Sequence, residues 1–177
     1  KEIRAARGQE TVPVLKEIDR REAGRSPFFW RLGRRELIRI GVYGGSGYTG
    51  QELLRLLIGH PGAEVVAATS RRFAGVPVSA VYPVFAGLTD LVYTDASPEE
   101  VAGLADFIFL ALPHGISMEF APIFIRAGRK VVDLSADFRL RDAASYEAWY
   151  GRHTAAGTLG DAVYGLPELY REQIRNA

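Results

Sequence analysis

The sequence predicts an α/β domain built on a parallel sheet, and three observations support this fold class. From residue 37 onward, short apolar runs alternate with stretches of helical periodicity, which indicates strands joined by right-handed helical crossovers. The second of these apolar runs, at residues 64–69, is continuous, as expected for a strand covered on both faces. The chain has 177 residues, of which 47% are hydrophobic, and this is enough for the core of one domain.

Local signals place the elements in order along the chain. A first strand is predicted at 38–43, followed at 51–58 by a helix with a wide face of leucines. Ser97 precedes Pro98 and two glutamates, and this predicts a helix start with a serine N-cap. The remaining predicted elements are strands at 64–69, 107–112 and 130–134, a helix at 117–127 that ends at Gly128, and a last helix that opens at Pro167.

The composition excludes several classes of protein. The net charge is +1, which gives no support to electrostatic binding of nucleic acid or of a membrane surface. The absence of cysteine excludes a disulfide scaffold, a zinc ribbon and a thiol nucleophile within these residues. The longest apolar run, 107–113, is too short to span a bilayer. We therefore expect a cytoplasmic protein, and a fragment or processed product because the sequence starts at Lys1.

Residues 1–37 are interpreted as a basic N-terminal extension or linker, and residues 38–177 as the folded domain. The first stretch carries 10 Lys and Arg residues against 6 Asp and Glu residues. Its segment 25–31 mixes basic and aromatic side chains, a pattern that also suits a nucleic acid or a membrane surface. We favour docking of these aromatic side chains on the following domain, and so predict neither nucleic acid nor a membrane as a partner.

A glycine-rich turn links the first predicted strand to the first predicted helix. Read from Gly45 it fits the pattern G-x-G-x-x-G, in which the backbone approaches a pyrophosphate closely and the first amides of the helix face its charge. The alternative is a tight turn without a ligand, but the strand before it and the helix after it favour dinucleotide binding. We predict a Rossmann-type doubly wound sheet, with cofactor-binding residues Gly44, Gly45, Ser46, Gly47, Tyr48, Thr49 and Gly50.

The end of the second predicted strand indicates NADP as the cofactor. NAD-binding domains place a carboxylate about 20 residues after the glycines, whereas Ser70, Arg71 and Arg72 stand here. A hydroxyl and two guanidinium groups suit the 2′-phosphate of NADP, which a carboxylate would repel. The alternative is a solvated basic turn.

The loops after the third and fourth predicted strands lie at the carboxyl edge, where open α/β sheets bind ligands. We predict that Pro113 and His114 lie along the cofactor and that Ser135 reaches the nicotinamide or its ribose. His114 is either an acid–base group or a residue that orients its loop. We favour the second role, because no nucleophile for it to activate is visible nearby in the sequence.

Two carboxylates, Asp133 and Asp137, stand four residues apart after the fourth predicted strand. A metal would need a third ligand, and none accompanies them, so no metal site is predicted. We expect Asp137 to pair with Arg139 or Arg141, or to cap a turn.

Five segments in this order resemble the N-acetyl-γ-glutamyl-phosphate reductases of arginine biosynthesis. They are GGSGYTGQELLRLL (44–57), TSRRFAG (69–75), ALPHG (111–115), DLSADFR (133–139) and YGLPE (164–168). The resemblance covers about residues 37–177. Reductases of aminoadipyl or glutamyl phosphates linked to the carrier LysW look similar over the same region, whereas aspartate-semialdehyde dehydrogenases share the architecture and fit these motifs less well.

The resemblance implies NADPH-dependent reduction of a small acyl phosphate to a semialdehyde. In that chemistry a cysteine thiolate displaces phosphate and hydride reduces the resulting thioester. The family carries this cysteine in an Asn-Pro-Gly-Cys segment after YGLPE, followed by a substrate and dimerisation domain, so a homo-oligomer is implied. Neither part lies within these 177 residues. We therefore assign no catalytic residue and expect cofactor binding without turnover; a non-catalytic NADP sensor is the alternative.

Overall fold

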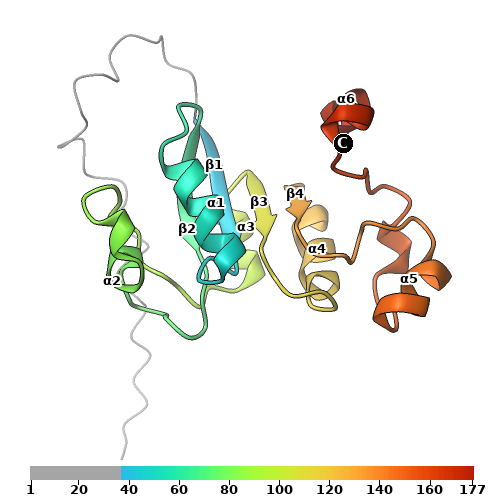
Figure 1. Ribbon diagram of the computed structural model, residues 1–177, viewed down its shortest axis with the longest axis horizontal. Coiled ribbons are helices and arrows are strands. Elements are labelled where there is room, and N and C mark those ends of the chain that lie inside the picture. Colours follow the sequence, from blue (N-terminus) through green and yellow to red (C-terminus); the bar gives the residue numbers. More distant parts are fainter. Residues whose placement is uncertain (1–36) are drawn as a thin grey trace, which may run out of the picture. The chain divides into compact units, whose positions relative to one another are not determined.

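A computed structural model describes residues 37–177, and the predictions made for residues 1–36 lie outside this part of the chain. The described part contains a four-stranded parallel sheet with the strand order β2-β1-β3-β4. This confirms the predicted fold class, and Figure 1 shows the strands with helices packed against them. The strands are β1 (Ile38–Tyr43), β2 (Ala63–Ala68), β3 (Phe107–Leu110) and β4 (Lys130–Asp133).

The helices match the predicted ones where the local signal is strong. Helix α3 (Pro98–Leu104) has a reciprocal capping box at its start, in which Ser97 Oγ accepts from the Glu100 amide and the Glu100 carboxylate accepts from the Ser97 amide. Gly128 has a φ of +72° and ends the next helix as predicted. The helices are α1 (Tyr48–Ile58), α2 (Val78–Val81), η3 (Pro83–Phe85), α3 (Pro98–Leu104), α4 (Ser117–Arg126), α5 (Ala143–Tyr150), η4 (Ala156–Thr158) and α6 (Pro167–Asn176).

Four elements, α2, η3, α5 and η4, were not predicted, and the start of α1 lies earlier than expected. Helix α1 begins inside the glycine-rich turn, three residues before the predicted start at Gln51. Helices α2 and η3 are single turns without a repeated apolar period. Helix α5 is amphipathic only weakly, and its start depends on Asp142, whose carboxylate accepts from the Ser145 amide at 2.7 Å.

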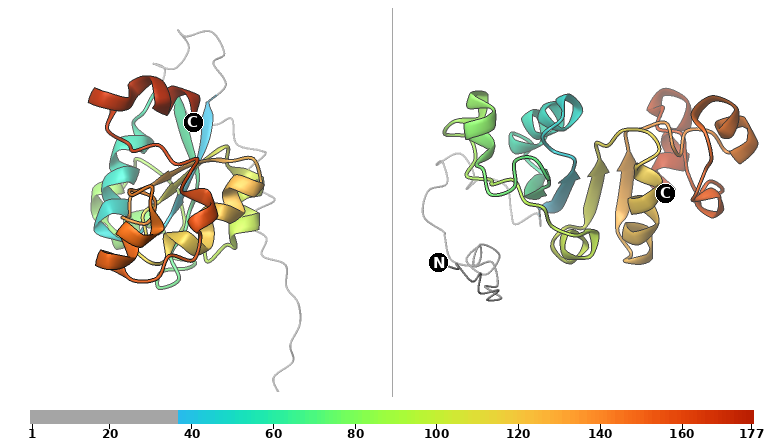
Figure 2. Two further views of the ribbon diagram at one scale, coloured as in Figure 1. Left: turned by 90° about the vertical axis from the view of Figure 1, so that its right-hand side faces the viewer. Right: turned by 90° about the horizontal axis from the view of Figure 1, so that it is seen from below.

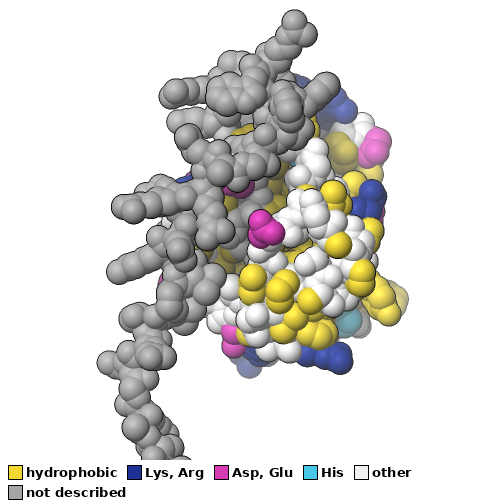
Figure 3. All heavy atoms as spheres, turned by 90° about the vertical axis from the view of Figure 1, so that its left-hand side faces the viewer, with side chains coloured by type: hydrophobic (Ala, Val, Ile, Leu, Met, Phe, Trp, Pro, Cys, Tyr) yellow, Lys and Arg dark blue, Asp and Glu magenta, His cyan; other side chains and the backbone are white. Residues whose placement is uncertain are grey.

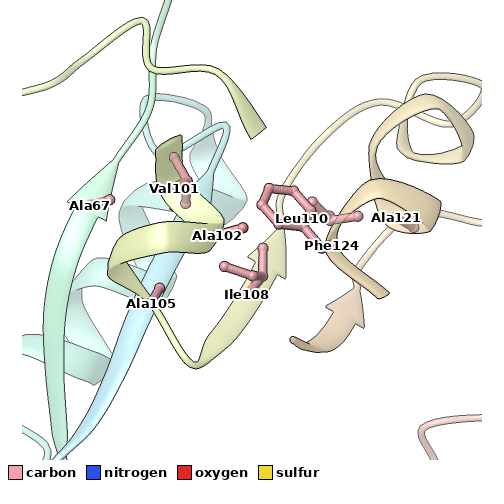
Figure 4. Close-up of a cluster of buried hydrophobic side chains, with 8 residues drawn as sticks. All are labelled: Ala67, Val101, Ala102, Ala105, Ile108, Leu110, Ala121 and Phe124. Carbon is pink, nitrogen blue, oxygen red and sulfur yellow. The ribbon is translucent and has the colours of Figure 1, made fainter. Parts of the chain in front are cut away.

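The two faces of the sheet carry separate clusters of buried side chains, which explains the continuous apolar strands. Ile40 and Val42 of β1 join α1 and the segment after β2 on one face. Ile108 and Leu110 of β3 join α3 and α4 on the other face, the cluster drawn in Figure 4. Figure 2 shows α1 on one side of the sheet and α3 with α4 on the other. Along β3, alternate residues enter opposite cores, since Phe107 and Phe109 pack against the first cluster and Ile108 and Leu110 belong to the second.

The segment between β2 and α3 extends the sheet beside β2. Thr69 forms a parallel bridge with Thr94, and Pro77 an antiparallel bridge with Val92. Figure 3 views the molecule from the side of α2 and shows hydrophobic side chains gathered on the face turned toward the viewer.

Within residues 37–177, no helix combines the length and the apolar character that crossing a membrane requires.

Candidate functional site

The strand order creates a switch point at the carboxyl ends of β1 and β3. The chain leaves β1 toward β2 and returns to add β3 on the opposite side of β1. Open α/β sheets bind ligands in the crevice outside such a point. The Ala111 amide donates to the Tyr43 carbonyl at 2.8 Å, so the glycine-rich turn and the loop after β3 leave the sheet side by side.

Two glycines of the turn are required by close backbone approach. Gly44 has a φ of +91°, and a Cβ there would lie 2.5 Å from the Ala111 carbonyl oxygen. A Cβ on Gly50 would lie 2.7 Å from the Cα atom of Gly45 and would also meet the carbonyl oxygen of Gly44. The first turn of α1 therefore packs directly on the backbone that leaves β1.

The turn leaves a set of backbone amides available for an anion. The end of β2 accepts from the first two glycines: Thr69 Oγ1 from the Gly44 amide at 3.0 Å and the Thr69 carbonyl from the Gly45 amide at 2.8 Å. No acceptor among residues 37–177 pairs with the amides of Ser46, Tyr48, Thr49 and Gly50. These amides lie at or beside the N-terminus of α1, where the helix dipole favours negative charge.

The predicted 2′-phosphate residues are joined to the glycine-rich turn. Ser70 is 7% exposed, and its hydroxyl oxygen lies 2.7 Å from that of Ser46 and accepts from the Phe73 amide at 3.2 Å. Arg71 and Arg72 are exposed, and the Arg72 guanidinium carbon lies 5.0 Å from the centre of the Phe73 ring. None of the ion pairs within residues 37–177 uses either arginine.

The loop after β3 is held by a buried carboxylate from the loop after β4. Asp137 is fully buried and accepts from the Gly115 amide at 2.7 Å and 3.0 Å and from the Met118 amide at 3.3 Å. Asp137 thus caps the start of α4, in line with the expectation that it caps a turn. The other expectation was an ion pair with Arg139 or Arg141, and no such pair is found in the described residues. Pro113 and His114 are exposed, and the His114 ring centre lies 5.7 Å from that of Tyr150.

A tyrosine and a histidine that the sequence reasoning missed complete this support. Tyr146 of α5 donates to Asp137 Oδ1 at 2.8 Å. Burial, as the main cause, and this hydrogen bond, as the second, raise the pKa of Tyr146 to about 12. His153 Nδ1 accepts from the Ala155 amide, so His153 Nε2 is the donor to the Asp137 carbonyl at 2.8 Å. No sequence motif marks these contacts, because the bonded residues lie 9 and 16 positions apart in the chain.

Ser135 lies at the carboxyl end of β4, but its hydroxyl is already engaged. It donates to Asp133 Oδ2 at 2.6 Å and accepts from the Asp137 amide at 3.0 Å. The structure therefore brings together the glycine-rich turn and Ser70, and separately ties Ser135 to the loop of Pro113 through Asp137. No group of three or more potential metal ligands occurs within residues 37–177.

Comparisons with known proteins agree with this geometry. The family model described as "Semialdehyde dehydrogenase, NAD binding domain" matches residues 39–177. An N-acetyl-gamma-glutamyl-phosphate reductase of Symbiobacterium thermophilum is 53% identical over 141 residues, which are 79% of this chain and 40% of that protein. A LysW-L-2-aminoadipate/LysW-L-glutamate phosphate reductase of Saccharolobus solfataricus is 49% identical over 144 residues, which are 81% of this chain and 41% of that protein.

The chain thus spans about 40% of the length of the curated relatives it matches. Among solved structures, the aspartate semialdehyde dehydrogenase of Candida albicans with NADP has a TM-score of 0.53 and 25% identity over 60% of this chain and 32% of that one. Aspartate semialdehyde dehydrogenase II of Vibrio cholerae has a TM-score of 0.56 and 16% identity over 79% of this chain and 38% of that one, a likeness of fold.

Proposed function

Because the chain belongs to the family of semialdehyde dehydrogenase NAD-binding domains, we propose that it is the NADP-binding part of an enzyme that reduces N-acetyl-γ-glutamyl phosphate to N-acetylglutamate semialdehyde. Relatives named for this reductase, at 50% to 53% identity over about four fifths of the chain, support this substrate. That reaction belongs to arginine biosynthesis. The relative named for LysW-linked substrates, at 49% identity, favours a carrier-linked acyl phosphate as the second candidate.

The observation that carries the proposal is the set of amides at the start of α1, directly at the switch point, that pair with no acceptor among residues 37–177. They suit a pyrophosphate, which accepts hydrogen bonds and carries negative charge. The residues proposed to hold the pyrophosphate half are Gly44, Gly45, Ser46, Gly47, Tyr48, Thr49 and Gly50.

NADP is proposed over NAD on the chemistry beside β2. Ser70 is followed by two exposed arginines, and a 2′-phosphate accepts bidentate hydrogen bonds from such groups. No carboxylate stands at this place to bind a free ribose hydroxyl. Pro113, His114 and Ser135 are proposed to face the nicotinamide end, since their loops leave β3 and β4 at the same edge of the sheet. When bound, NADPH would supply the hydride.

These 177 residues contain no cysteine. We therefore propose that the chain by itself binds the cofactor and does not turn over an acyl phosphate. The same absence favours one further candidate, a non-catalytic NADP sensor. Residues 1–37 as an extension before the domain, a homo-oligomeric assembly of the longer enzyme and a cytoplasmic location are parts of the same proposal, and the last two rest on the similarity to the named reductases.

The test is a calorimetric titration of the 177-residue chain with NADP⁺ and, in parallel, with NAD⁺. The proposal expects saturable binding of NADP⁺ at a ratio of about one per chain, with at least about a tenfold preference over NAD⁺. Equal affinities would contradict the assignment of the 2′-phosphate residues. Absence of binding by either cofactor would contradict the assignment of the glycine-rich turn.

A further inference from the structure

Two tyrosines from outside the glycine-rich turn donate hydrogen bonds to successive carbonyl groups within it. Tyr93 Oη donates to the Gly45 carbonyl at 3.2 Å. Tyr82 Oη donates to the Ser46 carbonyl at 2.6 Å. The tyrosines follow α1 in the chain by more than 20 residues and come from the segment between β2 and α3. No other side chain in residues 37–177 donates to these two carbonyls.

Both phenol groups are held in place by the segment that carries them. Tyr93 is fully buried; its amide donates to the Val76 carbonyl at 3.0 Å and its carbonyl accepts from the Gly75 amide at 2.7 Å. The Tyr82 ring packs edge-on against Phe85, with ring centres 6.5 Å apart, and Phe85 is 1% exposed. The two hydroxyls therefore approach the turn from a fixed framework.

A hydrogen bond to a carbonyl also fixes the amide on the other side of the same peptide plane. The peptide unit is planar, so the carbonyl of one residue and the amide of the next point in opposite directions. Holding the Gly45 carbonyl consequently fixes the direction of the Ser46 amide, one of the amides without a partner in the described residues. Holding the Ser46 carbonyl fixes the Gly47 amide, whose bond to the Gly44 carbonyl is long at 3.4 Å.

We propose that Tyr82 and Tyr93 are positioning residues that orient the peptide planes of the glycine-rich turn toward a pyrophosphate. The inference rests on the proposed function, because it assumes that this turn holds the dinucleotide. A turn with glycines at 44, 45 and 47 has many accessible backbone conformations in the free chain. Ordering it before the ligand arrives removes part of the entropic cost of binding.

The protonation state of the Tyr93 phenol suits this role. Burial, with a smaller contribution from Tyr82, raises the pKa of Tyr93 to about 12, so its hydroxyl remains a proton donor throughout the neutral range. A donor that stays neutral holds a carbonyl without adding a negative charge beside the bound anion.

The experiment compares two ligands on Tyr82→Phe and Tyr93→Phe in the full 177-residue chain. NADP⁺ contains the pyrophosphate, whereas adenosine 2′-monophosphate carries the 2′-phosphate alone. We expect the dissociation constant for NADP⁺ to rise about three- to tenfold in each variant, as for loss of one hydrogen bond, while that for adenosine 2′-monophosphate changes less than about twofold. Hydrogen exchange of residues 44–50 is expected to accelerate by a similar factor.

Tyr43→Phe is the matched control, since Tyr43 Oη also donates to a backbone carbonyl, that of Ala96 at 3.3 Å, which is not a carbonyl of the turn. It is expected to leave both affinities unchanged. The inference is overturned if the wild-type chain binds NADP⁺ and both tyrosine variants bind it equally well, or if they lose both ligands in parallel. Failure of the wild-type chain to bind NADP⁺ would overturn the proposed function itself. Should Tyr93→Phe fail to fold, the same two titrations of Tyr82→Phe still test the inference, because Tyr82 is only partly buried.

Discussion

At the scale of single residues, crowding decides which glycines of the turn are replaceable. Gly50 sits where the first turn of α1 meets the backbone leaving β1, and a Cβ there would come within 2.7 Å of Gly45 atoms. Gly59 ends the same helix with a φ of −91°, and no atom lies within 4 Å of a Cβ built there. The same substitution therefore has opposite steric consequences at the two ends of one helix.

Gly50→Ala is expected to destabilise the chain by about 1–3 kcal/mol, the usual cost of overpacking, and to weaken NADP⁺ binding because the turn must shift. Gly59→Ala is expected to change the free energy of unfolding by less than about 0.5 kcal/mol. Urea unfolding of both variants, followed by titration with NADP⁺, gives the comparison. Equal stability of the two variants would contradict the close packing of α1 on the turn.

The exposed arginines after β2 are proposed to set the preference for NADP⁺ over NAD⁺. Arg72→Ala is expected to raise the dissociation constant for NADP⁺ about tenfold and to leave that for NAD⁺ unchanged, because only NADP⁺ offers a 2′-phosphate for a charged hydrogen bond. Arg71→Ala should act in the same direction. Arg175→Ala, in an exposed pair with Glu172 on α6, is the control and should affect neither cofactor. An equal loss for NADP⁺ and NAD⁺ would contradict a specific 2′-phosphate contact.

At the scale of elements, the loop after β4 organises the loop after β3. Asp137 caps α4 across a sequence separation of 19 to 22 residues, and Tyr146 of α5 donates to the same carboxylate. One fully buried side chain thereby joins the start of α4, the loop of His114 and the body of α5. Replacing it affects the loop proposed to face the nicotinamide without touching the glycine-rich turn.

Asp137→Asn is expected to cost about 2–3 kcal/mol, because an amide has one acceptor oxygen for three donors and adds a donor of its own. Asp142→Asn is the matched control: Asp142 caps α5, and asparagine is as good an N-cap as aspartate. Chemical denaturation measures both changes. A result in which Asp142→Asn costs as much as Asp137→Asn would contradict the special role of the buried carboxylate.

At the scale of the whole molecule, two cores on opposite faces of one sheet hold the domain together. Two buried tyrosines lie in different clusters: Tyr93 lies in the cluster with α1, and Tyr146 of α5 lies in a third, smaller cluster with Met118 and Ala136. Each has its pKa raised to about 12, mainly by burial. Ionisation of these side chains therefore opposes the folded state.

The stability of the chain is expected to fall as the pH rises from about 10 to about 12. The unfolded tyrosine loses its proton near pH 10, whereas the folded one does so near 12. The stabilisation from the neutral phenols is therefore complete below pH 10 and is lost across this window, by about 1–2 kcal/mol per tyrosine with solvent screening allowed for.

Urea unfolding at pH 9 and pH 11.5 measures this loss, and Tyr93→Phe should make it smaller. Tyr48→Phe serves as control, since the Tyr48 side chain is 90% exposed. A pH dependence that Tyr93→Phe leaves as steep as in the wild type would contradict the assignment to buried tyrosines.

The helices and strands differ in how well the sequence predicts them. The strands, α1, α3, α4 and the start of α6 could be predicted, because apolar periodicity, the N-cap Ser97 and the glycine Gly128 act on neighbours a few residues away. Helix α5 was missed, since its one buried residue, Tyr146, gives no apolar stripe. The bounds of α1 were wrong by one turn, because the glycine-rich turn itself is helical from Tyr48.

The sequence by itself determined the fold class, the glycine-rich turn and the basic residues after β2, because each depends on local pattern and on the chemistry of adjacent side chains. Only the tertiary structure decided that Ser70 reaches Ser46, that Asp137 holds the loop of His114, and that Tyr82 and Tyr93 donate to carbonyls of the turn. These contacts join residues 22 to 48 positions apart. Their geometry arises when crossovers bring separate strand ends to one edge, and no local pattern records which ends will meet.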